Sequence, residues 1–434
     1  MYKHCYQGIA RVHLLMENLE AYQGTDMSAD ERSFMLAQAK ALRGYFYSWL
    51  YQCYREVPLV TESLTMDNMY QAKASRADIY AQIMNDFDGA IAALPDKPYS
   101  DAQMSGYFSP GALKALKARL MLAEAYDDKG NADPSKMGDI VSLLESINGY
   151  SLADRMRDNF ISSKQLASPE IMFSVRYLAP NITHSMDLYY GAWTTCGVTR
   201  DLVNAFECTD GLKWGDSPLT VPVDESLLAT GELGDANKAE RTKLFQNRDR
   251  RLYETVCHSG VAIFPDEGYE ENGPITITNQ MQTGFGMMKL LQPTTEMPSY
   301  STISDADVVI LRYAEVLMMI AEAENEANGP TQKVYDAVNK VRVRSGQPEL
   351  PAGLTKDQMR ERIRNEWRVE FVFEGHRYFQ LKRWKLMDKL VNGASDPALP
   401  TYVKVFKPAF YYFPLPQSEI DKAGGVLVQD PNYK

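Results

Sequence analysis

The sequence has no uninterrupted apolar run of the roughly 20 residues that a helix needs to cross a bilayer. Its most apolar helical stretch, around Leu317, is interrupted by Glu315 and Glu322. Basic residues are in the minority, since 46 Lys and Arg face 57 Asp and Glu and give a net charge of −11. Such a charge does not favour phosphate backbones or anionic lipid. We therefore expect no transmembrane helix and no nucleic-acid partner.

Cysteine and histidine are scarce, with five of each, and no CxxC pair suggests a zinc site or a redox couple. The phosphate-cradling GxxxxGK(S/T), the serine-nucleophile GxSxG and the zinc-binding HExxH patterns are absent as well. We therefore predict no cofactor, no metal ion and no catalytic residue. A glycoside hydrolase stays open as an alternative, because it needs only two suitably spaced carboxylates.

Helical periodicity, in contrast, is abundant. Apolar residues recur at spacings of three and four over residues 5–19, 35–53, 79–94 and 113–123. Helix starts are marked by Ser28 with Glu31, which form a capping box, by Ser75, and by Ser109 before Pro110. Helices paired at short intervals, each with one apolar stripe, are typical of stacked tetratricopeptide-like hairpins.

A second helical block is predicted from Val309, with Ile310 and Tyr313 on its apolar face and a capping box at Thr355. Between the blocks, turn signals alternate with short β-prone runs such as residues 171–175. We predict a mainly α fold of tetratricopeptide-like helical hairpins, an α/α superhelix, with an irregular, loop-rich subdomain that contains short strands. The predicted parts are a helical scaffold over residues 1–149 and 305–393, a variable subdomain over 150–304, and a C-terminal packing tail over 394–434 whose aromatic run 410–414 is buried.

Two acidic features invite a functional interpretation. Glu366 and Glu370 lie four residues apart on one helix face, as a catalytic pair would. We interpret both as members of structural ion pairs, because arginines surround them in sequence. The loop 127–133 departs from the order of an EF-hand, with Lys129 at a ligand position, and is interpreted as a solvated turn. His376 is interpreted as a packing or capping residue. The surrounding arginines are Arg360, Arg362, Arg364, Arg368 and Arg377.

Aromatic residues in predicted loops point to a ligand. Sugar rings present flat C–H faces that stack on aromatic side chains, beside polar rims that need hydrogen-bonding partners. Loop aromatics are therefore our candidates for ligand binding. The four that lie outside any predicted helix are Tyr189, Tyr190, Trp193 and Trp214. The other three tryptophans fall within helical periods and are predicted to be core residues: Trp49, Trp367 and Trp384.

Several stretches together carry a family pattern. They are LRYAEVL at residues 311–317 with AEA at 321–323, NKVRVR at 339–344, the stretch 363–384, and the ending with FPLP at 413–416 and QDPNY at 429–433. Residues 39–45 and 57–59 fit as well. On these residues nearly the whole chain resembles the SusD/RagB family of nutrient-binding outer-membrane lipoproteins. The chain departs from the family at Trp367, where arginine is usual.

The resemblance implies four tetratricopeptide-like helix pairs that support a variable subdomain, which helps to form the ligand site. It also implies a non-enzymatic protein at the surface of the cell outer membrane that captures glycans and delivers them to a SusC-like TonB-dependent transporter. The family's signal peptide, lipidated cysteine and first segment have no counterpart before Tyr6, so the start is expected to be truncated. Membrane attachment is expected only through that absent lipid anchor. A tetratricopeptide-type adaptor that binds protein alone is the second alternative.

Overall fold

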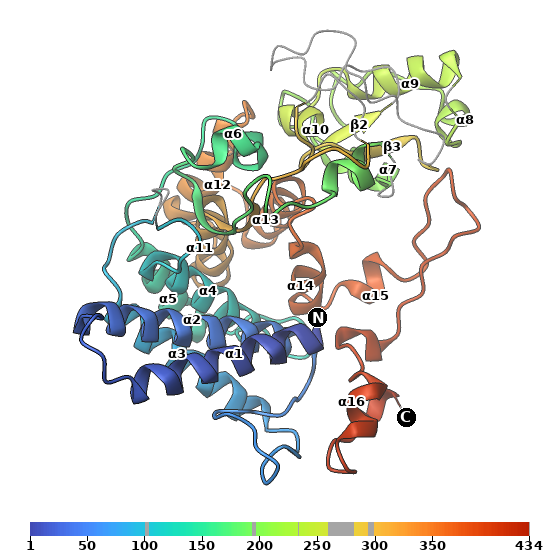
Figure 1. Ribbon diagram of the computed structural model, residues 1–434. Coiled ribbons are helices and arrows are strands. Elements are labelled where there is room, and N and C mark those ends of the chain that lie inside the picture. Colours follow the sequence, from blue (N-terminus) through green and yellow to red (C-terminus); the bar gives the residue numbers. More distant parts are fainter. Residues whose placement is uncertain (100–103, 193–196, 233, 259–281, 294–298, 434) are drawn as a thin grey trace.

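The computed structural model describes residues 1–99, 104–192, 197–232, 234–258, 282–293 and 299–433. Five helices form the N-terminal part, and each packs against the next along the chain (Figure 1). Three of them start as predicted, because Ser28, Ser75 and Ser109 each accept a hydrogen bond from the backbone N–H three residues on. The helices are α1 (Tyr2–Ala21), α2 (Ala29–Cys53), α3 (Arg76–Ala93), α4 (Pro110–Glu124) and α5 (Pro134–Glu145).

A second group of helices completes the helical body. Helix α11 packs against α5 as well as against α12 and α13, so the two groups are continuous. The second predicted capping box is present, with Thr355 and Gln358 bonded reciprocally. The helices are α11 (Tyr313–Asn328), α12 (Gln332–Arg344), α13 (Lys356–Glu370), α14 (His376–Arg383) and α15 (Met387–Leu390).

The predicted start of this second block is wrong by several residues. Strand β4 (Val308–Arg312) precedes α11, so Ile310 lies on a strand and not on a helix face. The β-branched run Val308, Val309 and Ile310 favours a pleated backbone over a helical one. Strand β4 pairs in antiparallel register with β1 (Ile171–Val175), the run that the sequence marked as β-prone.

Between β1 and β4 the chain forms an irregular subdomain of short elements. Its two-stranded sheet pairs β2 (Val256–His258) with β3 (Phe285–Met287). The fold class is therefore confirmed: mainly helical, with an irregular part that contains short strands. The exact boundaries of the four parts stay predictions. The other elements here are a π-helical turn (Asp187–Ala192), α7 (Arg200–Ala205), α8 (Glu225–Leu228), α9 (Asp235–Phe245) and α10 (Arg250–Thr255), and α6 (Ser162–Gln165) precedes β1.

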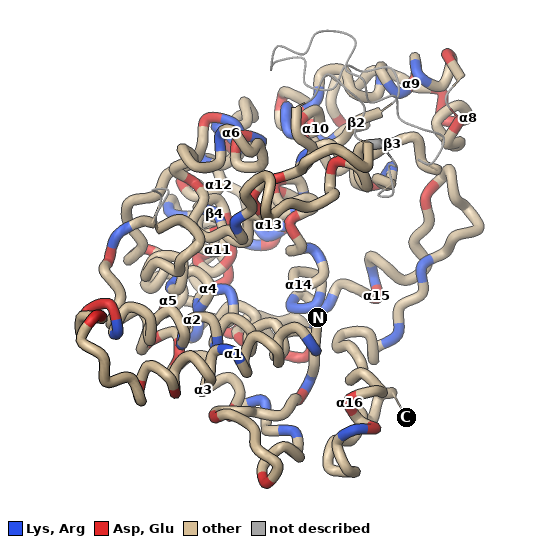
Figure 2. Tube along the Cα trace, viewed as in Figure 1, with Lys and Arg blue, Asp and Glu red and all other residues tan. Residues whose placement is uncertain are grey.

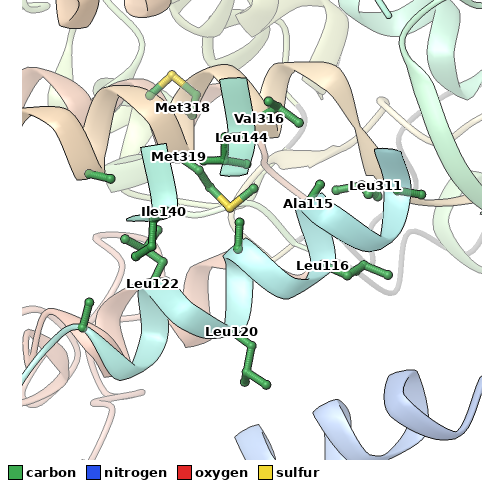
Figure 3. Packing of buried hydrophobic residues seen from close by; sticks show 14 of the residues in the cluster. Ala115, Leu116, Leu120, Leu122, Ile140, Leu144, Leu311, Val316, Met318 and Met319 are labelled. Atoms are coloured by element: carbon green, nitrogen blue, oxygen red, sulfur yellow. The ribbon is translucent and has the colours of Figure 1, made fainter. Parts of the chain in front are cut away.

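Two hydrophobic clusters hold these parts together. The larger runs through the helical body, where Leu122 of α4, Ile140 of α5 and Met319 of α11 come together (Figure 3). The smaller lies in the irregular subdomain around Phe206 and Phe285. Helix α13 serves both, because Met359, Ile363 and Trp367 belong to the first cluster and Val369 belongs to the second. The subdomain is thus packed directly on the scaffold.

The C-terminal tail passes over one side of the helical body and includes α16 (Gln417–Lys422) (Figure 1). The prediction that residues 410–414 are buried is wrong, since Phe410 and Phe413 are 40% and 41% exposed. This run, which begins in a 3-10 helix (Pro408–Tyr411), lies on the surface of the helical body, so only some of its side chains are covered. Tyr411 and Tyr412 are half-buried beneath the ammonium groups of Lys385 and Lys382. None of the helices in the described residues combines the length and apolar character needed to cross a membrane.

Candidate functional site

A cavity of about 330 Å³ lies where the helical body meets the irregular subdomain. Its volume is within the range of about 300–1,000 Å³ that is typical of small-ligand pockets. The walls come from α2, α4, α11, α13 and α14 on one side, and from the π-helical turn, β3 and β4 on the other. Residues far apart in sequence therefore meet at one place.

Four half-buried aromatic residues line this cavity: Trp49 of α2, Tyr190 of the π-helical turn, Phe379 of α14, and Phe373 between α13 and α14. The ring centroids of Trp49 and Phe379 are 5.7 Å apart with an interplanar angle of 71°. Ser48 and Gln52 line the cavity beside Trp49 and add hydroxyl and amide groups. Apolar ring faces next to uncharged polar groups suit a ligand with both kinds of surface.

The four aromatic residues predicted from the sequence do not lie together. Tyr190 lines the cavity, whereas the neighbouring Tyr189 is 48% exposed and is not among the lining residues. Trp214 is half-buried against the smaller hydrophobic cluster, with the guanidinium groups of Arg200 and Arg248 at 5.1 and 5.8 Å from its ring centroid. Trp193 lies outside the described residues. Ligand binding by these four residues stays a prediction.

Trp49 lines the cavity although sequence reasoning assigned it to the core, and so does the buried Trp367. Helical spacing assigned Trp49 to the core, but its side chain is half-buried and faces the cavity. A signal was present in the sequence, because the polar Gln52 follows Trp49 by one helical turn on the same stripe. The assignments of Trp367 and Trp384 to the core are confirmed, with exposed fractions of 2% and 3%.

Charged residues also line the cavity, and each is paired. Arg119 donates two hydrogen bonds to the Glu315 carboxylate, both at 2.6 Å. Burial by itself raises the pKa of Glu315, but the attraction of Arg119 outweighs it and the pKa is lowered overall. Glu374 accepts hydrogen bonds from Arg312 at 2.7 and 2.8 Å. Burial raises the pKa of Glu374 as well, but the attraction of Arg312 contributes to lowering it overall.

Arg383 completes this set of paired charges. Its Nε and Nη2 groups donate to the Glu322 carboxylate at 2.8 and 2.6 Å. Burial lowers the pKa of His376 to about 4, so this imidazole is neutral at pH 7, with its Nε2 3.7 Å from Glu315. The described part of the cavity wall therefore presents balanced charges.

A buried ion network adjoins the cavity through Glu374, and it corrects one prediction. Glu366 and Glu370 are in ion pairs, as expected, but the arginines come from other elements. Arg251 of α10 contacts both carboxylates, Arg342 is 3.0 Å from Glu366, and Arg312 is 2.6 Å from Glu370. Acidic and basic residues are interleaved around α11, α13 and α14 (Figure 2).

The arginines near in sequence have partners of their own. Arg364 and Arg368 are two residues away from the glutamates, and such positions do not share a helix face. The first pairs with Glu361 and the second with Asp201. Proximity along the chain was therefore a poor guide to the partners of carboxylates that are buried.

Metal binding finds no support in the described residues. Among them, no group of three or more His, Cys, Asp or Glu side chains is placed to hold an ion. In the loop 127–133, the Asp127 carboxylate accepts hydrogen bonds from the backbone N–H groups of Lys129 and Asn131. That arrangement is a turn, as the sequence indicated.

The protein is expected to lose about 3 kcal/mol of stability between pH 6.5 and pH 4 through His376 alone. In this window the unfolded chain binds a proton at His376 that the folded protein, with its pKa near 4, does not. Unfolding by urea at pH 4 and pH 7 measures the loss. In His376→Gln the difference between the two pH values shrinks by that amount, whereas His4→Gln, at an exposed position, leaves it unchanged. An equal difference in both variants contradicts the assignment.

Comparisons with known proteins agree with this architecture. The pattern of the SusD family matches residues 154–433, and that of a family described as "Starch-binding associating with outer membrane" matches residues 1–122. The SusD-like protein P38 of Formosa agariphila is 25% identical over 80% of this chain, which spans 66% of that relative. The SusD-like protein P2 of the same organism is 22% identical over 92% of this chain and 74% of its own length.

Solved structures share the fold. A SusD-like protein of Bacteroides fragilis NCTC 9343 superposes with a TM-score of 0.76 at 23% identity, covering 100% of this chain and 85% of that one. A laminarin-binding SusD-like protein superposes with a TM-score of 0.66 at 22% identity over the same shares. The SusD family pattern covers more than half of the chain and includes the irregular subdomain, the helices α11 to α14 and the tail. The chain therefore belongs to the SusD family.

Proposed function

We propose that this protein is a non-catalytic glycan-binding protein. The cavity between the helical body and the irregular subdomain takes part of an oligosaccharide or polysaccharide. Trp49, Tyr190 and Phe379 stack on its sugar faces, and Ser48 and Gln52 bond its hydroxyl groups. The observation that carries this proposal is the convergence of aromatic residues from α2, the π-helical turn and α14 on one cavity.

Relatives support the class of ligand. One family that matches the N-terminal part is described as starch-binding, and a structural neighbour binds laminarin. By the same relationship, we place the protein at the outer membrane and propose that it passes its cargo to a SusC-like TonB-dependent transporter. Capture of a glycan at the cell surface and its transfer to a transporter require binding but no catalysis.

The electrostatics of the cavity favour binding over hydrolysis. A glycosidase needs one carboxyl group that stays protonated near neutral pH, and therefore a raised pKa. The two carboxylates that line the cavity, Glu315 and Glu374, both have lowered pKa values because arginines hold them. Neither is suited to protonate a glycosidic oxygen.

The remaining sequence candidates stay in the proposal as further ligand contacts. Tyr189 lies on the same π-helical turn as Tyr190 but is exposed, and Trp214 lies under two guanidinium groups in the subdomain. Trp193 keeps its place as a candidate from sequence alone. Alanine substitution of each in the binding assay described next decides which of them touches glycan.

Affinity electrophoresis against a panel of neutral and acidic polysaccharides tests the proposal, with the same mixtures analysed for released sugars. We expect retardation by at least one polysaccharide without any product. Released oligosaccharides would support the glycoside hydrolase alternative instead. Binding to a transporter or a peptide, with no retardation by any glycan, would support the protein-binding adaptor.

A further inference from the structure

We propose that the cavity selects a neutral saccharide and rejects uronate and sulfate groups, and that the indole N–H of Trp367 donates to an oxygen of that sugar. This inference rests on the proposed glycan-binding function and names the class of glycan.

The first argument is that the cations of the cavity wall are already engaged. Arg119 points Nε and Nη2 at Glu315, and Nη2 also donates to the backbone oxygen of Ile310 at 3.0 Å. Arg383 presents the same two groups to Glu322. An arginine in such a bidentate pair already uses the two N–H groups that are best placed to bind a second carboxylate. An anionic sugar would have to displace Glu315 or Glu322, both of which are buried.

The second argument is that the cavity wall offers an anionic group no spare positive charge, because its charges are already balanced. Glu315 and Glu374 also line the cavity, and their lowered pKa values keep them ionised at neutral pH. His376 supplies no positive charge there, because burial lowers its pKa to about 4. A uronate or sulfate moved from water into this wall loses its hydration without gaining a counterion.

The third argument concerns an uncommitted donor. Trp367 lines the cavity and is 2% exposed, yet its Nε1 group has no hydrogen-bond partner among the described residues. The nearby Trp384 differs, since its Nε1 donates to Glu322 at 2.8 Å. Buried N–H groups nearly always have an acceptor. A ligand that brings a hydroxyl or ring oxygen supplies the missing one, and neutral sugars carry many such oxygens.

Matched polysaccharides test the selection by charge. A neutral polysaccharide retained in the panel is compared, by isothermal titration calorimetry, with the same polymer after oxidation of its primary alcohols to carboxylates. We expect the oxidised form to bind at least tenfold more weakly. Equal or tighter binding of the oxidised form, or retention of acidic polysaccharides alone, overturns this inference but leaves glycan binding intact. If no polysaccharide binds, the proposed function fails and the inference fails with it.

Matched tryptophan variants test the donor. Trp367→Phe keeps an aromatic ring and removes the N–H, so we expect neutral glycan to bind about five- to tenfold more weakly. Trp384→Phe makes the same change at a residue that does not line the cavity, and it removes one of the donors to Glu322, which keeps its hydrogen bonds from Arg383. We expect this control to lower the melting temperature and leave the Kd unchanged. An unchanged Kd in a folded Trp367→Phe protein overturns the role assigned to the indole.

Discussion

Glu370→Gln is expected to lower the free energy of unfolding by about 3–5 kcal/mol, the usual cost of breaking a buried ion pair on one side only. The Glu370 carboxylate is fully buried and contacts Arg251, Arg312 and Arg344. A neutral amide leaves those guanidinium groups short of one negative charge. Burial acts against the ionised form, yet the arginines lower the pKa of Glu370 well below its ordinary value. Urea unfolding at pH 7 measures the effect.

The same helix offers a matched control. Glu361 also lies on α13 and pairs with Arg364 at 2.9 Å, but its side chain is 71% exposed. Pairs of this kind contribute at most about 0.5 kcal/mol, so Glu361→Gln should leave stability almost unchanged. Similar losses in the two variants would mean that the buried network is not what makes Glu370 important.

Trp49→Ala is expected to weaken glycan binding about 30-fold, which corresponds to roughly 2 kcal/mol and is typical of a tryptophan at the centre of a binding site. Trp49 supplies a large aromatic face to the cavity, beside Phe379 and the polar Ser48 and Gln52. Isothermal titration calorimetry with the polysaccharide found in the panel measures the change.

Phe46→Ala controls for loss of packing. Phe46 lies on the same helix and is half-buried like Trp49, but its ring packs against Gly8 of α1 and does not line the cavity. We expect this variant to lose stability and keep its affinity for glycan. If both variants bind equally well once folded, the cavity is not the binding site and the other sequence candidates Tyr189, Trp193 and Trp214 gain support.

Much of the fold follows from local chemistry that a sequence records. Side-chain caps at Ser28, Ser75, Ser109 and Thr355 fix where helices begin, and apolar spacing of three and four fixes their buried faces. The start of α11 was misplaced because a β-branched run with apolar residues at every position fits both periodicities. Only its pairing with β1, more than 100 residues earlier, decides in favour of a strand.

The site was harder to predict because it is made by long-range contacts. Tyr190 was found as an aromatic residue in a predicted loop. Trp49, in contrast, shares its helical stripe with core residues, and nothing in the local sequence shows that its side chain faces a cavity. The partners of Glu366 and Glu370 were missed for the same reason. Arg251 and Arg342 reach them from α10 and α12, which are distant in sequence.

The antiparallel ladder between β1 and β4 has a further consequence for how such proteins diversify. Val175 pairs with Val308, so the chain leaves the scaffold and returns to it at adjacent points. A segment whose ends are already fixed side by side can change in length at little cost in loop-closure entropy. We therefore expect the segment between those two valines to act as a cassette that the matching segment of a relative can replace, which would change the ligand of the proposed glycan site. Arg251 would have to be kept in every cassette, because Glu366 and Glu370 of the scaffold depend on its charge.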